Sequence, residues 1–114
     1  MLNNQTLIAA LRFREERDWR QFHSPLNLAI AIAVESGELL EQFQWSVPGE
    51  QRPNAEQRIA IEQEVADIAI VLSYLTNDLG IDIDAVVQNK LALNARRYPV
   101  EKSRGTAVKY DRLP

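Results

Sequence analysis

Two pairs of acidic residues are the part of this sequence best suited to chemistry. Glu35 and Glu38 form an ExxE pair, and Glu64 and Asp67 form an ExxD pair. A spacing of three residues places both members of a pair on one face of a helix. Each pair borders an apolar run, and a carboxylate inside an apolar interior is costly unless it is paired, hydrogen-bonded or bound to a metal. We therefore expect the four carboxylates to form one cluster between two packed helices.

Four carboxylates without histidine or cysteine offer hard oxygen ligands, which suit Mg²⁺ or Mn²⁺ better than zinc or copper. Magnesium usually takes one or two carboxylates and completes its shell with water and substrate phosphates. Four carboxylates around one ion would leave excess negative charge, so more than one metal with a phosphorylated substrate is expected. One acid could then orient or deprotonate water. A di-iron site is disfavoured because no histidine follows either pair in the Glu-x-x-His pattern.

Lys90, Asn94 and Arg97 recur at spacings of four and three residues, which places them on one face of a predicted helix. The two cations could bind the same substrate phosphates. Other interpretations remain open. Lys90 and Arg97 could lie on a solvated helix face, and Asn94 could hydrogen-bond to a neighbouring helical turn instead of to a nucleobase. Tyr98, which precedes Pro99, is typical of a packing residue.

Three aromatic or imidazole side chains could contact a nucleobase. Trp19 and Trp45 could stack on a base, or they could belong to the core or an interface. His23 is the only histidine, and by itself it is typical of a loop or the surface.

The acidic pairs could also lie on a solvated helix face, although their apolar context and their duplication argue against that.

Hydrophobic periodicity predicts four helices and no strand. We place them over residues 5–19, 26–45 and 55–79, and from a cap at Asp82 or Asp84 to about residue 98. Residues 46–54 contain prolines and a glycine and are predicted as a loop. Residues 100–114 are a polar tail that could be mobile. We therefore expect one all-α domain over residues 1–114, folded as an antiparallel four-helix bundle that oligomerises.

Local signals predict where these helices begin and end. Asn4 is a possible N-cap of the first helix, and Ser24 followed by Pro25 suits an N-cap and a first helical position. Gly80 is a natural end for the third helix, and Pro99 stops the fourth.

The faces of the first two helices follow from the same periodicity. Leu28, Ile32, Glu35 and Leu39 form one stripe of the second helix, so Glu35 points where apolar residues point. On the first helix, Arg14 and the charged residues after it are expected on the solvated face.

Composition excludes several classes of function. The chain has 114 residues, of which 46% are hydrophobic and 25% charged, and a net charge of −3, which argues against polymeric nucleic acid as a partner. It contains no cysteine, so neither a disulfide framework nor a thiolate metal site is expected. We see no signal-peptide pattern and no membrane-spanning run, and we expect a cytoplasmic protein without a membrane partner.

Taken together, these residues resemble the MazG-like all-α nucleoside triphosphate pyrophosphohydrolases, and most closely the short dCTP pyrophosphatase branch. The ExxE and ExxD motifs mark that superfamily. Five segments carry the closer resemblance: RDWRQFHSPLNL (17–28), ESGELLEQFQW (35–45), EVADIAIVLSYL (64–75), KLALNARRYP (90–99) and KYDRLP (109–114). They occur in order and cover most of the chain outside the first helix and the loop.

The resemblance implies hydrolysis between the α- and β-phosphates of a nucleoside triphosphate, with removal of surplus or damaged deoxynucleotides as the biological role. It implies Mg²⁺ held by Glu35, Glu38, Glu64 and Asp67. It implies contacts to the phosphates or the sugar from Lys90, Asn94, Arg97 and Tyr98. It implies a nucleoside pocket near Trp19, His23 and Trp45. It also implies that a terminal segment with Lys109 and Tyr110 could close over the substrate. It also implies a homo-oligomer, either a tetramer built as a dimer of dimers or a dimer.

Two questions stay open at this point. Ile70 and Val71 stand where relatives place an aromatic residue, so the preference for dCTP or a modified cytosine nucleotide is less firm than the reaction. Either Glu35 or Glu38 could activate the water. The alternatives are a non-catalytic, oligomeric nucleotide-binding or regulatory module, and a phosphohydrolase of another phosphorylated metabolite.

Overall fold

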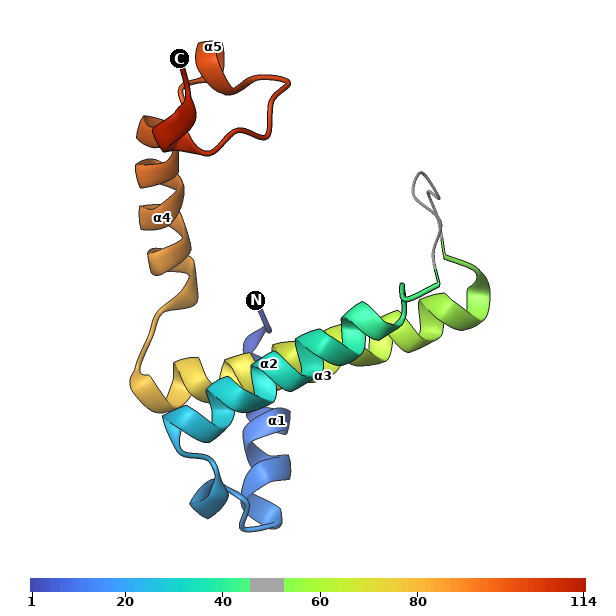
Figure 1. Cartoon of the computed structure of the whole chain (residues 1–114). Coiled ribbons are helices and arrows are strands. Elements are labelled where there is room, and N and C mark those ends of the chain that lie inside the picture. The colour runs from blue at the N-terminus through green and yellow to red at the C-terminus, as the bar shows by residue number, and fades with distance from the viewer. Residues whose placement is uncertain (46–52) are drawn as a thin grey trace. The chain divides into compact units, whose positions relative to one another are not determined.

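The structure, a computed structural model, describes residues 1–45 and 53–114, and within them it is helical without strands (Figure 1). The helices are α1 (Asn4–Glu16), α2 (Pro25–Glu41), α3 (Ala55–Leu79), α4 (Ile83–Arg97) and α5 (Val100–Ser103), with short 3₁₀ turns η1 (Arg20–Phe22) and η2 (Tyr110–Arg112). Residues 1–80 and residues 81–114 form two compact units. The all-α class is therefore confirmed, while the four-helix bundle and its oligomerisation stay predictions.

Helix α1 begins and ends earlier than the sequence pattern suggested. Its N-cap is Asn3, whose Oδ1 accepts a hydrogen bond from the Thr6 backbone N–H at 2.8 Å, so our choice of Asn4 was wrong by one residue. The helix ends at Glu16 rather than at Trp19, because Asp18 has a φ of 51°. A non-glycine residue in this left-handed region cannot continue a right-handed helix.

Helix α2 starts where Ser24 and Pro25 predicted, and the Ser24 hydroxyl accepts from the Asn27 backbone N–H at 3.1 Å. It ends at Glu41, and the chain turns through residues 42–45, so our end at residue 45 was too late. The predicted stripe is confirmed as its protected side, with Leu28 only 1% exposed.

Helix α3 has the predicted bounds. Asn54 caps its start, and Gly80 ends it with a φ of 65°. That left-handed conformation is one that glycine adopts without steric cost. Helix α2 packs along α3, and α1 contacts α3 as well (Figure 1).

The contact between α1 and α3 overturns one expectation. Arg14, expected in solvent, is only 3% exposed. Its guanidinium donates two hydrogen bonds of 2.8 Å to the Asp78 carboxylate on α3, and Arg20 adds a third contact to Asp78 at 3.2 Å. A planar guanidinium paired in this bidentate way can be buried at modest cost. Helical periodicity could not reveal the partner, which lies 64 positions away in the sequence.

The second unit contains α4, α5 and η2. Asp82 caps α4, as one of the two predicted alternatives, by accepting from the Ala85 backbone N–H at 3.2 Å. The predicted tail is not without structure, since it forms α5 and η2. Tyr110 of η2 packs edge-on against Tyr98, with ring centroids 6.0 Å apart.

Side-chain burial is sparse for a chain this apolar. In the described part of the chain, Leu28 and Tyr74 are the buried large hydrophobic residues. Val65 on α3 is 50% exposed and Leu26 on α2 is 69% exposed, so the single chain leaves apolar side chains of both helices in water. Apolar area left in water gives up roughly 25 cal/mol per Å² of stabilisation.

Two further sequence expectations concern the loop and the membrane. Most of the loop predicted at residues 46–54 lies outside the described residues. None of the helices within residues 1–45 and 53–114 combines the length and hydropathy needed to cross a bilayer.

Candidate metal centre

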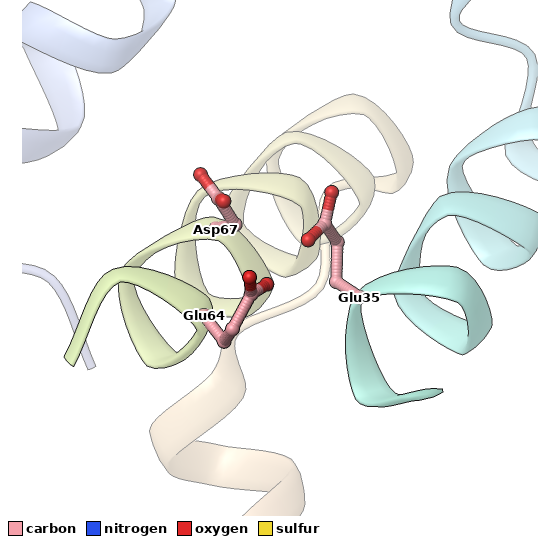
Figure 2. Close-up of side chains that lie close together, drawn as sticks. All are labelled: Glu35, Glu64 and Asp67. Carbon is pink, nitrogen blue, oxygen red and sulfur yellow. The ribbon is translucent and has the colours of Figure 1, made fainter. Parts of the chain in front are cut away.

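Three carboxylates from two helices converge in the first unit. Glu35 projects from α2, and Glu64 and Asp67 project from α3 (Figure 2). One oxygen atom from each residue lies within 4.8 Å of the others. Local structure explains this convergence, because Glu64 and Asp67 share one face of α3 and Glu35 lies on the protected stripe of α2.

The environment of Glu35 shows that the cluster is electrostatically crowded. Burial raises the pKa of Glu35 to about 7, helped by hydrogen bonds to Glu64 and Glu38 that only the protonated form makes, and then by the charges of Glu38 and Asp67. Atoms Oε2 of Glu35 and Oε2 of Glu64 are buried without a hydrogen-bond partner. Unpartnered, buried carboxylate oxygens on facing helices are suited to a hard divalent cation.

Two of our four predicted ligands have surroundings that differ from the expectation. Glu38 lies next to Glu35 and affects its pKa, but it is outside the group of three whose oxygens converge. Asp67 was expected to be buried, and it is exposed. The physical reason is that α3 faces a cavity here rather than another packed helix.

That cavity has a volume of about 650 Å³ and extends from Asp67 to α1. Its wall includes Trp19, His23, Phe13 and Tyr74, and most of the lining is apolar. Trp19 packs edge-on against Phe13 with ring centroids 5.7 Å apart. The sequence thus pointed to Trp19 and His23, but it did not single out Phe13 and Tyr74. The spacing of seven between Asp67 and Tyr74 was the available signal, since it places both on one helix face.

His23 is not the surface residue that a lone histidine suggests. It is half-buried, and its ring stacks on Tyr74 with centroids 5.5 Å apart and planes inclined by 28°. Burial lowers the pKa of His23, and the positive charge of Arg14 lowers it further. The imidazole is therefore neutral at physiological pH.

Of the remaining predicted residues, Trp45 belongs to the first unit and the others belong to the second. Trp45 is 87% exposed after the end of α2. The others belong to the second unit: Lys90, Asn94, Arg97, Tyr98, Lys109 and Tyr110. There the Arg97 guanidinium lies over the Tyr110 ring, 4.6 Å from its centroid, while Lys90 and Lys109 are exposed. Their approach to the carboxylates stays a prediction.

Comparison with known proteins places the chain in a family. A model of the MazG-like family matches residues 30–113. Over 105 residues the chain is 46% identical to dCTP pyrophosphatase 1 of Bos taurus and 41% identical to that of Homo sapiens, covering 90% of this chain in each case. The chain spans 62% of the length of these relatives.

A solved structure of a pyrophosphatase from Archaeoglobus fulgidus DSM 4304 is also similar. Its TM-score is 0.71 at 34% identity, and the match covers 83% of this chain and 90% of that one. The family match therefore spans both compact units, and the structural match supports the helical fold. The chain belongs to the MazG-like family.

Proposed function

We propose that this chain is a metal-dependent nucleotide pyrophosphohydrolase that cleaves the bond between the α- and β-phosphates of a nucleoside triphosphate. The products are a nucleoside monophosphate and pyrophosphate, and the preferred substrate is dCTP or a related cytosine deoxynucleotide. The observation that carries this proposal is the convergence of Glu35, Glu64 and Asp67, two of them with buried, unpartnered oxygens. The relatives named dCTP pyrophosphatase 1 support the substrate class.

Glu35, Glu64 and Asp67 would hold Mg²⁺ or Mn²⁺, with Glu38 close enough to Glu35 to contribute. When bound, such ions supply charge neutralisation at the phosphates. The acids themselves provide a proton acceptor for the attacking water. Glu35 or Glu38 would take this role, since the two acids lie next to each other on α2 beside the cluster.

The cavity beside Asp67 would receive the nucleoside. Trp19 and His23 offer flat faces to a base, and their apolar surroundings exclude water from it. Lys90, Asn94, Arg97 and Tyr98 would contact the phosphates or the sugar, and the segment with Lys109 and Tyr110 would close over the bound substrate. Trp45 would complete the base pocket.

The protein would work as a homo-oligomer, either a tetramer built as a dimer of dimers or a dimer. The supporting observation is the apolar surface that the single chain leaves exposed, including Leu26, Ile30, Ile59 and Val65. Faces of this kind are typical of subunit interfaces. Such assembly would also bring further helices to the partly open cluster.

A product assay tests the reaction. Purified protein is incubated with each of the four dNTPs and four NTPs, with Mg²⁺ and with EDTA, and the products are separated by chromatography. We expect a nucleoside monophosphate and pyrophosphate, fastest from dCTP, and none in EDTA. Release of orthophosphate would exclude α–β cleavage and indicate a different phosphohydrolase.

A pair of matched variants shows whether the cluster carries this activity. Glu64→Gln should abolish turnover, because it removes one of the three converging carboxylates. Glu62→Gln is the control, since Glu62 is on the same helix but is 62% exposed and pairs with Arg58. Equal activity in both variants would reject the cluster as the active site. Absence of turnover in the wild type would favour a non-catalytic, nucleotide-binding module.

A further inference from the structure

Tyr74 is a buried side chain of the cavity wall to which the proposed reaction assigns no role. It is 4% exposed and lies on α3, seven residues after Asp67. Seven residues are about two helical turns, so both side chains are on the same face of α3. Both line the same cavity.

The contacts of Tyr74 connect three separate segments of that wall. Its hydroxyl donates a hydrogen bond of 2.7 Å to the Ala10 carbonyl on α1. Its ring stacks on His23, which lies in the connector between α1 and α2. Ala10, His23 and Tyr74 all line the cavity, so one side chain sets the distance between its walls.

Tyr74 is itself anchored by a buried ion pair. The Arg14 guanidinium lies 4.4 Å from the centroid of the Tyr74 ring. Arg14 is held by two hydrogen bonds to Asp78, which is one helical turn after Tyr74 on α3. The side chains of Arg14 and Asp78 are 3% and 10% exposed. A cation that is both desolvated and bonded at two points is rigid, and it attracts the ring face by a cation–π interaction.

We propose that Tyr74 is a positioning residue that holds His23 and the Ala10 segment of α1 in the cavity wall beside Asp67, and thereby determines how tightly the nucleoside is bound. This inference rests on the proposed function, since it takes the cavity as the nucleoside site. Tyr74 acts through its neighbours and not through the reacting phosphates. Its removal therefore weakens substrate binding and leaves the rate of the bound complex nearly unchanged.

Two variants and a control test the proposal. Tyr74→Leu removes the stack, the hydrogen bond and the cation–π contact together, whereas Tyr74→Phe removes only the hydrogen bond to Ala10. Phe43→Leu is the control, because Phe43 is 42% exposed after the end of α2 and is not part of the cavity wall.

The first readout is the affinity for a non-hydrolysable dCTP analogue, measured by calorimetry with Mg²⁺. We expect the dissociation constant to rise about tenfold in Tyr74→Leu, the upper range for an aromatic pair, and about threefold in Tyr74→Phe for the lost hydrogen bond. KM for dCTP should rise in parallel, with kcat within about twofold of the wild type. The control should match the wild type.

The second readout is the proton NMR titration of His23, which is unambiguous because the chain has one histidine. Tyr74→Leu should shift the His23 titration toward higher pH, as the ring loses its packed surroundings, while Tyr74→Phe should retain the wild-type titration. A residue that serves only the stability of the fold would lower the melting temperature without changing the affinity. That pattern would overturn the proposal.

The outcomes separate the two proposals. A wild type that binds the analogue without hydrolysing dCTP overturns the proposed function alone, and one that does neither overturns both. Loss of kcat without loss of affinity in the variants overturns the role of Tyr74. If Tyr74→Leu does not fold, Tyr74→Phe decides, and an unchanged dissociation constant in that variant overturns the role.

Discussion

Replacing Glu35 with glutamine should stabilise the metal-free protein at alkaline pH. The substitution keeps the size of the side chain and removes one negative charge from a cluster in which the carboxylates of Glu35, Glu64 and Asp67 converge within 4.8 Å. Because the raised pKa of Glu35 reflects burial and neighbouring acids, ionised Glu35 opposes folding in the absence of a cation. The amide has no such cost.

The size of this effect follows from the two pKa values. The ordinary value of 4.5 rises to about 7 in the folded chain, and at about 1.4 kcal/mol per pKa unit the full difference is about 3.5 kcal/mol. Glu35 is only half-buried, and water screens part of the repulsion. We therefore expect roughly 1–2 kcal/mol.

The direction of the Glu35 pKa shift determines the pH range over which the stability of the wild type changes. Between pH 4.5 and about 7 the folded state binds more protons than the unfolded state, so the wild type loses stability as the pH rises through this range. Glu35→Gln should not show that loss. Its advantage over the wild type should therefore be small at the acidic end of the window and complete by about pH 8.

Urea unfolding followed by circular dichroism, in EDTA and at one protein concentration, measures this difference. Glu41→Gln is the matched control on α2, where Glu41 is exposed. Added Mg²⁺ should reverse the order, because a ligand stabilises the state that binds it and the wild type keeps all the ligands. An advantage that is independent of pH, or an equal gain in the control, would refute the reasoning.

Three further substitutions test the supporting structure by urea unfolding. Asp78→Asn should cost about 3 kcal/mol of stability, because it leaves the buried Arg14 guanidinium without its charged partner. Arg14 holds the pKa of Asp78 below its usual range. The stabilisation by this ion pair should therefore be lost in the wild type as the pH falls through that lowered pKa. A cost near zero would show that the pair is dispensable. Gly80→Ala should cost about 1 kcal/mol because its φ is 65°, and a neutral result would mean that the turn rearranges. Ser24→Ala should also cost about 1 kcal/mol by removing the hydrogen bond to the Asn27 N–H, whereas Ser24→Thr should retain most of it.

Much of the helical layout could be predicted because its signals are local. The Ser24 cap and the Gly80 terminus depend on hydrogen bonds and backbone angles within one turn, and both were placed correctly. The error at the end of α1 has a local cause as well. Periodicity continues past Glu16, but the φ of 51° at Asp18 ends the helix, and no hydrophobic pattern encodes that angle.

The arrangement of the acidic pairs could also be predicted, because an i, i+3 spacing on an apolar helix constrains where its carboxylates point. The stripe that contains Glu35 and the face that contains Glu64 and Asp67 meet as the pattern required. Spacing could not distinguish Glu38 from Glu35, because both lie on the same side of α2. Only the packing of α2 along α3 decides which of the two completes the group.

The sequence by itself determined the four long helices, the cap at Ser24, the end at Gly80 and the two faces that carry acids, because each depends on neighbours within a few residues. The tertiary structure alone decided that Arg14 is buried against Asp78, and that Tyr74 bonds to Ala10 and stacks on His23. The first two of these contacts join residues 64 positions apart. A periodic pattern reports which face of a helix is apolar, but it holds no information about which distant side chain will meet that face.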